Sequence, residues 1–307
     1  MQRVLPSEEI SRSAPQPIPR LRLPERATIF SRRAVRLGEL ATDHALGDYL
    51  RLIQAAVQAQ DVLLAEVPVP RVNADGFEQA AAHRMPVLPA TDHRAHGEWR
   101  TTLRQLCDRL IQQRDLPAGV HALLDQLRHM PDAQLDAQAD ALLSLRIEQV
   151  NIALAPFLMA ALQVCWTDMA SALNVAAVPQ LDVSGVCPVC GSLPVASIVR
   201  SGKPYEGYRY LHCTLCATEW HRVRATCSHC DATEGIAYRF IEGGAECVRA
   251  ETCERCHTYR KILYQEKDQR AEPVADDLAS IALDLLVGEE GYQRVNQNPF
   301  LWHGRGD

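Results

Sequence analysis

The chain has 307 residues, of which 47% are hydrophobic, and it carries a formal net charge of −6. This length and composition provide for a sizeable core in about two domains, and the acidic balance does not favour binding to nucleic acid or a membrane surface through bulk charge. Residues 1–20 are polar and lack the apolar segment and cleavage site of a secretory signal. The longest apolar stretch, 152–166, is interrupted by Pro156 and falls short of the roughly 20 residues of a membrane span. We therefore expect a buried helix there, no membrane span, and a cytoplasmic protein whose thiols stay reduced.

The first part of the chain is predicted to be helical. Residues 1–24 are rich in proline and predict an irregular arm. Apolar residues then recur at helical spacing, as in Phe30, Ala34 and Leu37. The predicted helices span 25–40, 46–64, 77–83, 98–114, 117–130, 132–146 and 149–174. Together with the arm they predict an all-helical domain over residues 1–182, folded as an irregular bundle.

Eight cysteines beyond this domain form an internal repeat. They make four Cys-x-x-Cys pairs: Cys187/Cys190, Cys213/Cys216, Cys227/Cys230 and Cys253/Cys256. The loop between the first two pairs and the loop between the last two are both 22 residues long, and the second half repeats the first at a period of 40 residues. Two such turns, brought together by a hairpin, place four thiolates on one ion. The spacing therefore predicts two four-thiolate metal sites, with all eight cysteines as ligands.

The segments around these pairs predict small β modules. Runs with strand character lie at 194–200 and 205–211 in the first half, and at 236–241 and 245–250 in the second, followed by a closing strand at 259–265. We predict a first four-cysteine ribbon over 183–226 and a second over 227–270, each a zinc-ribbon or rubredoxin-like module. Residues 271–307 are predicted as a C-terminal helix, over 275–287, and a tail that packs back on the body. The predicted fold class is thus a multidomain protein, with an all-helical first domain followed by two small β modules and a C-terminal helix.

Two features of the metal sites stay open in the sequence. Sequential grouping, with the first four cysteines on one ion and the last four on another, is the simplest, but a cross-braced grouping uses the same residues. A tetrathiolate site suits either iron or zinc. Disulfides would need an oxidising compartment, and a thioredoxin-type dithiol needs one motif in a βαβ unit instead of four motifs in a repeat.

Other side chains are expected to be structural. Cys107 and Cys165 fall among apolar helical residues and are expected to be buried, whereas Cys247 is expected to be a free thiol. The histidines that adjoin the cysteine turns are expected to support the sites or lie on the surface, and those near residue 93 to lie in a solvated loop. These histidines are His212, His221, His229 and His257 beside the turns, and His83, His93 and His96 in the loop.

No catalytic residue is predicted, because the sequence shows no Gly-rich phosphate loop, nucleophile elbow or metalloprotease helix. Trp220, Tyr264 and Trp302 are candidates for contact with a partner protein, with packing inside their own domain as the alternative.

Several stretches, taken with the repeat, give the chain a resemblance to the FdhE family of formate dehydrogenase accessory proteins over nearly its whole length. These stretches are Arg33–Ala34, Leu46–Leu50, Cys187–Gly191, Arg209–Cys213, Glu219–His221, Lys261–Asp268, Ala275–Ala279 and Asn298–Leu301.

The resemblance implies a cytoplasmic maturation factor that is not an enzyme. Its implied partner is the catalytic subunit of respiratory formate dehydrogenase, bound while immature, before export by the twin-arginine route. It also implies rubredoxin-like iron at the eight paired cysteines, although only the first pair is followed by the glycine typical of a rubredoxin turn, Gly191.

Two other functions remain as alternatives. The first is a rubredoxin-like electron-transfer or redox protein, and the second is a nucleic-acid-binding zinc ribbon. The second is disfavoured because residues 187–270 hold 12 Lys and Arg against 10 Asp and Glu, too weak a basic excess for a phosphate-binding surface. The oligomeric state cannot be derived from the sequence.

Overall fold

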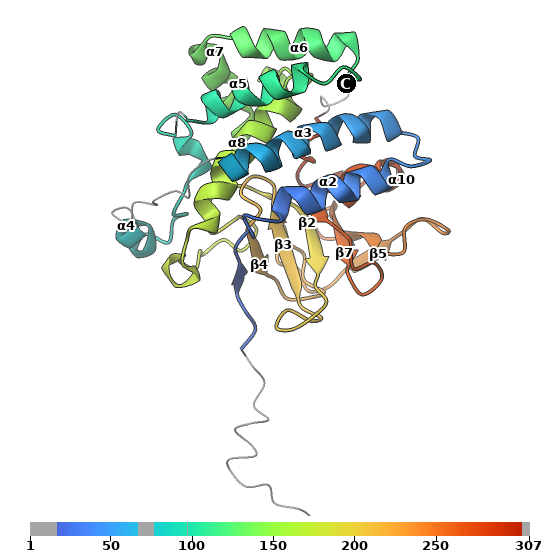
Figure 1. Ribbon diagram of the computed structural model, residues 1–307. Helices are drawn as coiled ribbons and strands as arrows, with labels where there is room; N and C mark the ends of the chain where they lie inside the picture. Colours follow the sequence, from blue (N-terminus) through green and yellow to red (C-terminus); the bar gives the residue numbers. More distant parts are fainter. Residues whose placement is uncertain (1–16, 67–76, 97, 303–307) are drawn as a thin grey trace, which may run out of the picture.

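The computed structural model describes residues 17–66, 77–96 and 98–302. A short strand and a helical region precede a strand-rich region, which is followed by two short helices and a final short strand (Figure 1). The helices of the first region are α2 (Ile29–Leu40), α3 (Gly47–Glu66), α4 (Phe77–Ala82), α5 (Glu98–Ile111), α6 (Ala118–His129), α7 (Asp132–Leu143) and α8 (Ala155–Ser171). The predicted fold class, helical first and then sheet-rich around the cysteine repeat, is confirmed.

Helix α8 is the centre of the helical region. Nearly all of its side chains are buried, in agreement with the buried helix expected from the apolar stretch. It begins at Ala155, later than predicted, because Asn151 forms a turn just before it. The side-chain oxygen of Asn151 accepts a hydrogen bond from the Ala153 N–H in this turn, and Pro156 lies in the first turn of the helix. In the described parts of the chain, no helix combines the length and apolar character needed to cross a membrane.

The strands form one mixed sheet instead of two separate modules. Its order is β1-β4-β3-β2-β7-β6-β5, with β8 also paired to β7. Strands β2, β3 and β4 belong to the first half of the cysteine repeat, and β5, β6 and β7 to the second. A parallel pairing of β2 with β7 joins the halves, with Ser197 opposite Ile262. The strands are β1 (Leu21–Arg22), β2 (Pro194–Val199), β3 (Arg209–Cys213), β4 (Glu219–His221), β5 (Ile236–Arg239), β6 (Val248–Cys253), β7 (Thr258–Tyr264) and β8 (Gln293–Arg294).

Two predicted strands begin later than expected, because glycine turns precede them. The strand predicted at 205–211 begins at Arg209, after a loop in which Gly202 and Gly207 adopt positive φ. The strand predicted at 245–250 begins at Val248, after a turn containing Gly243, which also has positive φ. The short strands β1, β4 and β8 were not predicted, since each is only two or three residues long.

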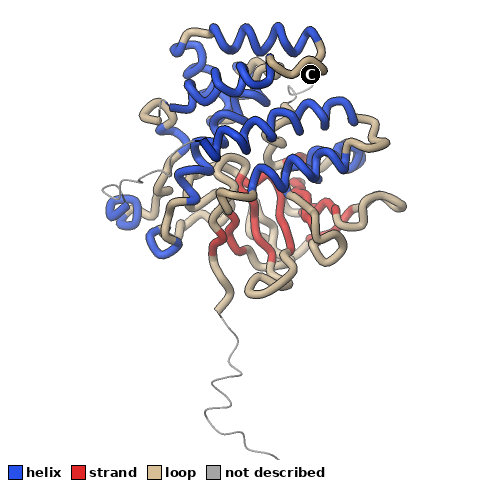
Figure 2. Tube along the Cα trace, viewed as in Figure 1, coloured by secondary structure: helices blue, strands red, loops and turns tan. Residues whose placement is uncertain are grey.

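The helices gather on one side of the sheet (Figures 1 and 2). Helix α2 lies next to the sheet, with α3 and then α5 and α6 farther away (Figure 1). The single helix predicted at 275–287 is instead two, α9 (Pro273–Ala279) and α10 (Ile281–Glu289). The break coincides with Lys261, whose buried ammonium donates to the carbonyl oxygens of Asp277 (2.7 Å) and Ser280 (3.1 Å).

Buried ion pairs fix α9 between the helical region and the sheet. Arg36 of α2 makes a two-pronged contact with the Asp276 carboxylate, at 2.9 and 2.6 Å. On the other side, Asp277 is fully buried between Lys261 (3.6 Å) and Arg294 (2.5 Å). Burial alone would raise the pKa of Asp277, but the charges of Arg294 and Lys261 hold it below its usual value.

Replacing Asp277 by alanine is expected to destabilise the protein by roughly 3–5 kcal/mol, because it leaves Lys261 and Arg294 with a single shared carboxylate, that of Asp284. Since the pKa of Asp277 is depressed, this contribution is present at neutral pH and is lost as pH falls through that pKa. Urea unfolding measures the effect, and Arg51→Ala, at an exposed ion pair on α3, is the control, with an expected change within about 0.5 kcal/mol. Equal stability of the two variants would contradict the role assigned to Asp277.

Candidate metal centres

The first four paired cysteines meet in one buried cluster. The Sγ atoms of Cys187 and Cys216 are 3.5 Å apart, and those of Cys190 and Cys213 are 3.4 Å apart. All four sulfurs lie within 4.8 Å of one another, and no cysteine of the set is more than 1% exposed. We call this group the inner cluster.

The last four paired cysteines form a second group of the same shape, here called the outer cluster. The Sγ distances are 3.7 Å for Cys227 to Cys256 and 3.7 Å for Cys230 to Cys253. The sulfurs again lie within 4.8 Å of one another, but Cys230 and Cys256 are partly exposed. The structure thus has the sequential grouping, and the cross-braced alternative does not occur.

All four cysteine turns have the same backbone conformation. The residue after the second cysteine adopts positive φ in every turn: Gly191 at 79°, Ala217 at 56°, Asp231 at 60° and His257 at 53°. Ala217 does so although alanine rarely adopts this conformation, which indicates that the surrounding contacts hold the turn in place.

The donor set fits a tetrahedral metal ion. With bonds of about 2.3 Å, four thiolates around one ion are separated by roughly 3.8 Å, and the closest sulfur pairs lie at 3.4–3.7 Å. Backbone N–H groups of Leu215 and Cys216 both point at the Cys213 sulfur, at 3.4 Å. Every cysteine of the chain is free of disulfide bonds. Burial raises the pKa of the Cys187 and Cys213 thiols well above the usual value, so a cation is needed to hold these sulfurs as thiolates.

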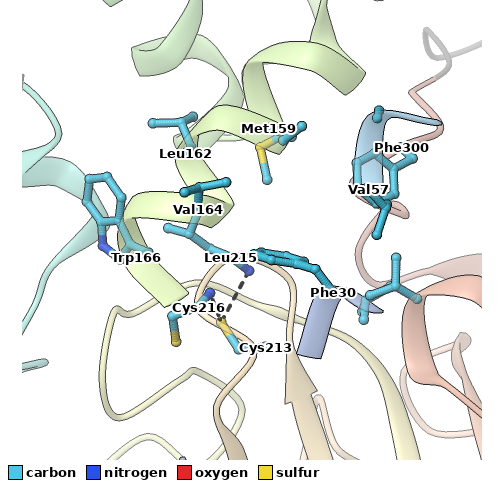
Figure 3. Packing of buried hydrophobic residues seen from close by; sticks show 14 of the residues in the cluster. Phe30, Val57, Met159, Leu162, Val164, Trp166, Cys213, Leu215, Cys216 and Phe300 are labelled. Carbon is cyan, nitrogen blue, oxygen red and sulfur yellow. Dashed lines mark hydrogen bonds between the residues drawn. The ribbon is translucent and has the colours of Figure 1, made fainter. Parts of the chain in front are cut away.

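The helical region holds both turns of the inner cluster. The N–H groups of Leu88 and Ala90 donate to the carbonyl oxygens of Val189 (2.8 Å) and Cys190 (2.9 Å) in the first turn. In the second turn, the buried amide of Gln163 on α8 donates to the Thr214 carbonyl at 2.7 Å. Figure 3 shows this second turn, with Leu215 at its tip, directed toward the apolar side chains of α8.

The outer cluster lies outside this core. Its cysteines pack in a small separate group with Ala232 and Ile236. Among the described residues, the hydrogen bonds of its turns go to the sheet region and to Ser184 just before it, as where the Gln293 N–H donates to the His257 carbonyl at 2.8 Å. The two clusters therefore share one ligand geometry but differ in solvent access and in support from the helices.

The histidines beside the cysteine turns take different places. His229 and His257 are exposed, and His221 is half-buried. His212 is only 1% exposed, and its Nδ1 bonds the buried Glu219 carboxylate at 2.9 Å, where Arg200 also binds. None of the four belongs to either sulfur group. The buried set of His212, Glu219 and Arg200 was missed in the sequence, where the three residues are separated and no motif joins them.

Two sequence expectations need correction or refinement. His93, expected in a solvated loop, is only 1% exposed, with Asp140 3.4 Å from its Nε2. Cys247 is free, as expected, but buried, and burial raises its pKa to about 11. Cys107 is buried and Cys165 largely so, as expected.

The aromatic candidates for partner contact pack within the protein. Trp220 and Trp302 are each 6% exposed and donate their indole N–H to the carbonyl oxygens of Ser184 and Pro299. Tyr264 is half-buried against the guanidinium of Arg249, 5.1 Å from the ring centre. The structure therefore agrees with the second interpretation, in which these rings pack within their own domain.

Family models match the chain in three consecutive segments. They are described as FdhE, N-terminal, over residues 18–182; FdhE, central domain, over 186–224; and FdhE, C-terminal domain, over 225–301. The inner cluster lies in the central segment, and the outer cluster in the C-terminal one.

Individual relatives match over the full length. A protein from Cronobacter sakazakii named Protein FdhE homolog is 39% identical over 99% of both chains, and Protein FdhE of Salmonella arizonae is 38% identical over 99% of both. The crystal structure of the FdhE protein from Pseudomonas aeruginosa superimposes with a TM-score of 0.83 at 39% identity, covering 93% of this chain and 100% of that one.

Proposed function

The chain belongs to the FdhE family, and we propose on that premise that it is a cytoplasmic accessory protein, not an enzyme. It binds the immature catalytic subunit of a respiratory formate dehydrogenase and assists its assembly before export. The observation that carries this proposal is family membership across the whole chain, helical region included, since cysteine ribbons alone occur in proteins of many functions. The lack of a membrane-crossing helix in the described residues agrees with such a role.

We further propose that each chain holds two metal ions, iron or zinc. Cys187, Cys190, Cys213 and Cys216 are the ligands of one ion, and Cys227, Cys230, Cys253 and Cys256 those of the other. The sulfur distances and the shared turn geometry support this assignment. Such an ion neutralises the four thiolates and cross-links the two turns of its cluster.

The two ions have different roles in this proposal. The inner ion braces the junction of the helical region and the sheet, because residues of both regions contact its turns. The outer ion is reached from solvent at Cys230 and Cys256. This exposure is the one observation that favours the second candidate function, a rubredoxin-like electron-transfer protein, because electron exchange with a partner requires a site near the surface.

The different support of the clusters predicts stepwise metal removal. A chelator is expected to remove the outer ion first, leaving about one ion per chain and a folded protein, because the inner sulfurs are closed to solvent. Metal content and circular dichroism are measured during chelation. Simultaneous loss of both ions would contradict this order. So would a Cys230→Ser protein, which lacks one ligand of the outer cluster, that loses its inner ion before its outer ion.

Binding to the partner is tested by co-purification. The tagged chain is expected to retain the precursor of the catalytic subunit of formate dehydrogenase and not its mature, exported form. Cys190→Ser is expected to lose most of the bound precursor, because the brace between the two regions is broken.

Cys165→Ser is the control for that experiment, since Cys165 lies outside both clusters and its thiol bonds the Thr102 hydroxyl at 3.7 Å. It should bind as the unchanged chain does. Absence of the precursor from every preparation, or equal capture of the mature subunit, would refute the proposed function.

A further inference from the structure

One buried arginine of the sheet region has no carboxylate partner. Arg260, on β7, is only 4% exposed, and its guanidinium forms no ion pair with any carboxylate among the described residues. Its Nη2 atom also has no hydrogen-bond partner there. A buried cation is costly unless an opposite charge lies near it, so the surroundings of Arg260 should contain a negative charge from another source.

The other buried or largely buried cations of this region are balanced by carboxylates. They are Arg209, which pairs with Glu251 at 2.7 Å, and Lys261 and Arg294, which share Asp277 and Asp284. Within this group of described residues, Arg260 is left as a positive charge in excess.

The guanidinium of Arg260 lies against the first turn of the outer cluster. Its Nε donates to the Ser228 hydroxyl at 2.9 Å, and Ser228 directly follows the ligand Cys227. Its Nη1 donates to the Pro194 carbonyl of β2. The group is therefore fixed between the two halves of the cysteine repeat, beside the sulfur ligands of the second half.

Two other arginines reach the same turn. Arg209 donates to the Thr226 carbonyl at 3.0 Å. Arg222 donates to the Cys227 carbonyl at 3.4 Å. Both of these arginines also pair with a carboxylate, so their charges are offset within the protein, whereas the charge of Arg260 is not.

The electrostatic surroundings of Arg260 agree with this difference. Burial, together with the positive charges of Arg209 and Arg294, lowers the pKa of Arg260 to about 9. Negative charge on Glu251 and on Cys227 raises that pKa, but the net effect stays downward. The carboxylates of the region thus do not offset this cation, and a sulfur of the outer cluster is one of the groups that favour its charged form.

A loaded outer cluster has the charge that Arg260 lacks. Four thiolates around one divalent ion leave two negative charges in excess, and opposite charges attract more strongly in a partly buried site than in water. The inner cluster has a different environment, because its turns accept hydrogen bonds from the neutral amides of Leu88, Ala90 and Gln163. Its ion therefore serves as a reference within the same chain.

We propose that Arg260 supplies the counter-charge of the metal centre in the outer cluster. Held by Ser228 and by the Pro194 carbonyl, its guanidinium stabilises the negative charge of the four thiolates and strengthens the binding of their ion. This inference rests on the proposed outer ion, and it names a residue outside the ligand set that determines how tightly the ion is held.

The test uses the full-length chain loaded with Zn²⁺ alone. A chelator is added stepwise, the zinc retained per chain is measured, and alkylation of the freed thiols with mass spectrometry identifies the cluster that has lost its ion. Arg260→Met keeps an unbranched side chain and removes the charge. It is expected to weaken zinc binding at the outer cluster about tenfold or more and to leave the inner cluster within about twofold.

Two further variants separate the charge of Arg260 from its packing. Arg260→Lys keeps the positive charge and is expected to retain most of the zinc affinity of the outer cluster. Glu251→Gln removes a buried negative charge two residues from Cys253. It is expected to hold the outer ion at least as tightly as the unchanged chain, although its free energy of unfolding falls. A purely structural role would weaken zinc binding in both the Arg260→Met and the Glu251→Gln protein.

Arg36→Met is the matched control, because it removes another buried arginine, one that pairs with Asp276. It should leave zinc binding at the outer cluster within about twofold. Unchanged zinc binding in Arg260→Met, or an equal loss in Arg260→Met and Arg36→Met, would overturn the proposal.

The Glu251→Gln protein keeps the proposal testable where Arg260→Met does not fold. Retention of the outer ion in Glu251→Gln then supports the proposal, and a tenfold loss there overturns it. Fewer than two zinc ions in the unchanged chain would instead refute the proposed metal sites themselves, so the two failures are distinguishable.

Discussion

The fold of the second half of the chain depends on holding four sulfur atoms within 4.8 Å of one another, twice. Thiolates at that separation repel one another, and burial disfavours the ionised form of a thiol. A metal cation at the centre stabilises the buried thiolates and offsets their repulsion. The turn geometry follows from the same constraint. All four turns share a positive φ at the residue after the second cysteine, and Ala217 adopts this conformation although alanine rarely does. In two of the turns, backbone N–H groups also point at the sulfur of the first cysteine.

The inner cluster connects this local constraint to the whole molecule. Its turns accept hydrogen bonds from Leu88, Ala90 and Gln163 of the helical region, and the same face of the sheet region carries α9, which Arg36 of α2 holds through Asp276. The helical region and the sheet therefore fold against each other around a buried polar junction as well as an apolar core. The outer cluster lacks this second layer of support, which explains why two halves of one sequence repeat have unequal burial.

The cysteine spacing was enough to predict that the eight sulfurs form two groups of four, and it favoured the sequential grouping without excluding the cross-braced one. The helical spacing of apolar residues was enough to predict most of the helices. The single sheet was not predictable, since the β2–β7 pairing joins residues such as Ser197 and Ile262 that share no local signal. The same holds for the buried His212, Glu219 and Arg200, whose contacts depend on the register of the strands. The division at residues 182, 226 and 270 stays a prediction.

The most direct test of the two metal sites is the metal content of the chain purified without oxygen or chelator, measured together with its free thiols and visible spectrum. Two ions per chain and no disulfide are expected. Absorption from thiolate to iron would identify rubredoxin-like iron, and a colourless protein would identify zinc. Fewer than two ions, with the paired cysteines oxidised to disulfides, would contradict the central claim that each group of four sulfurs is a metal site.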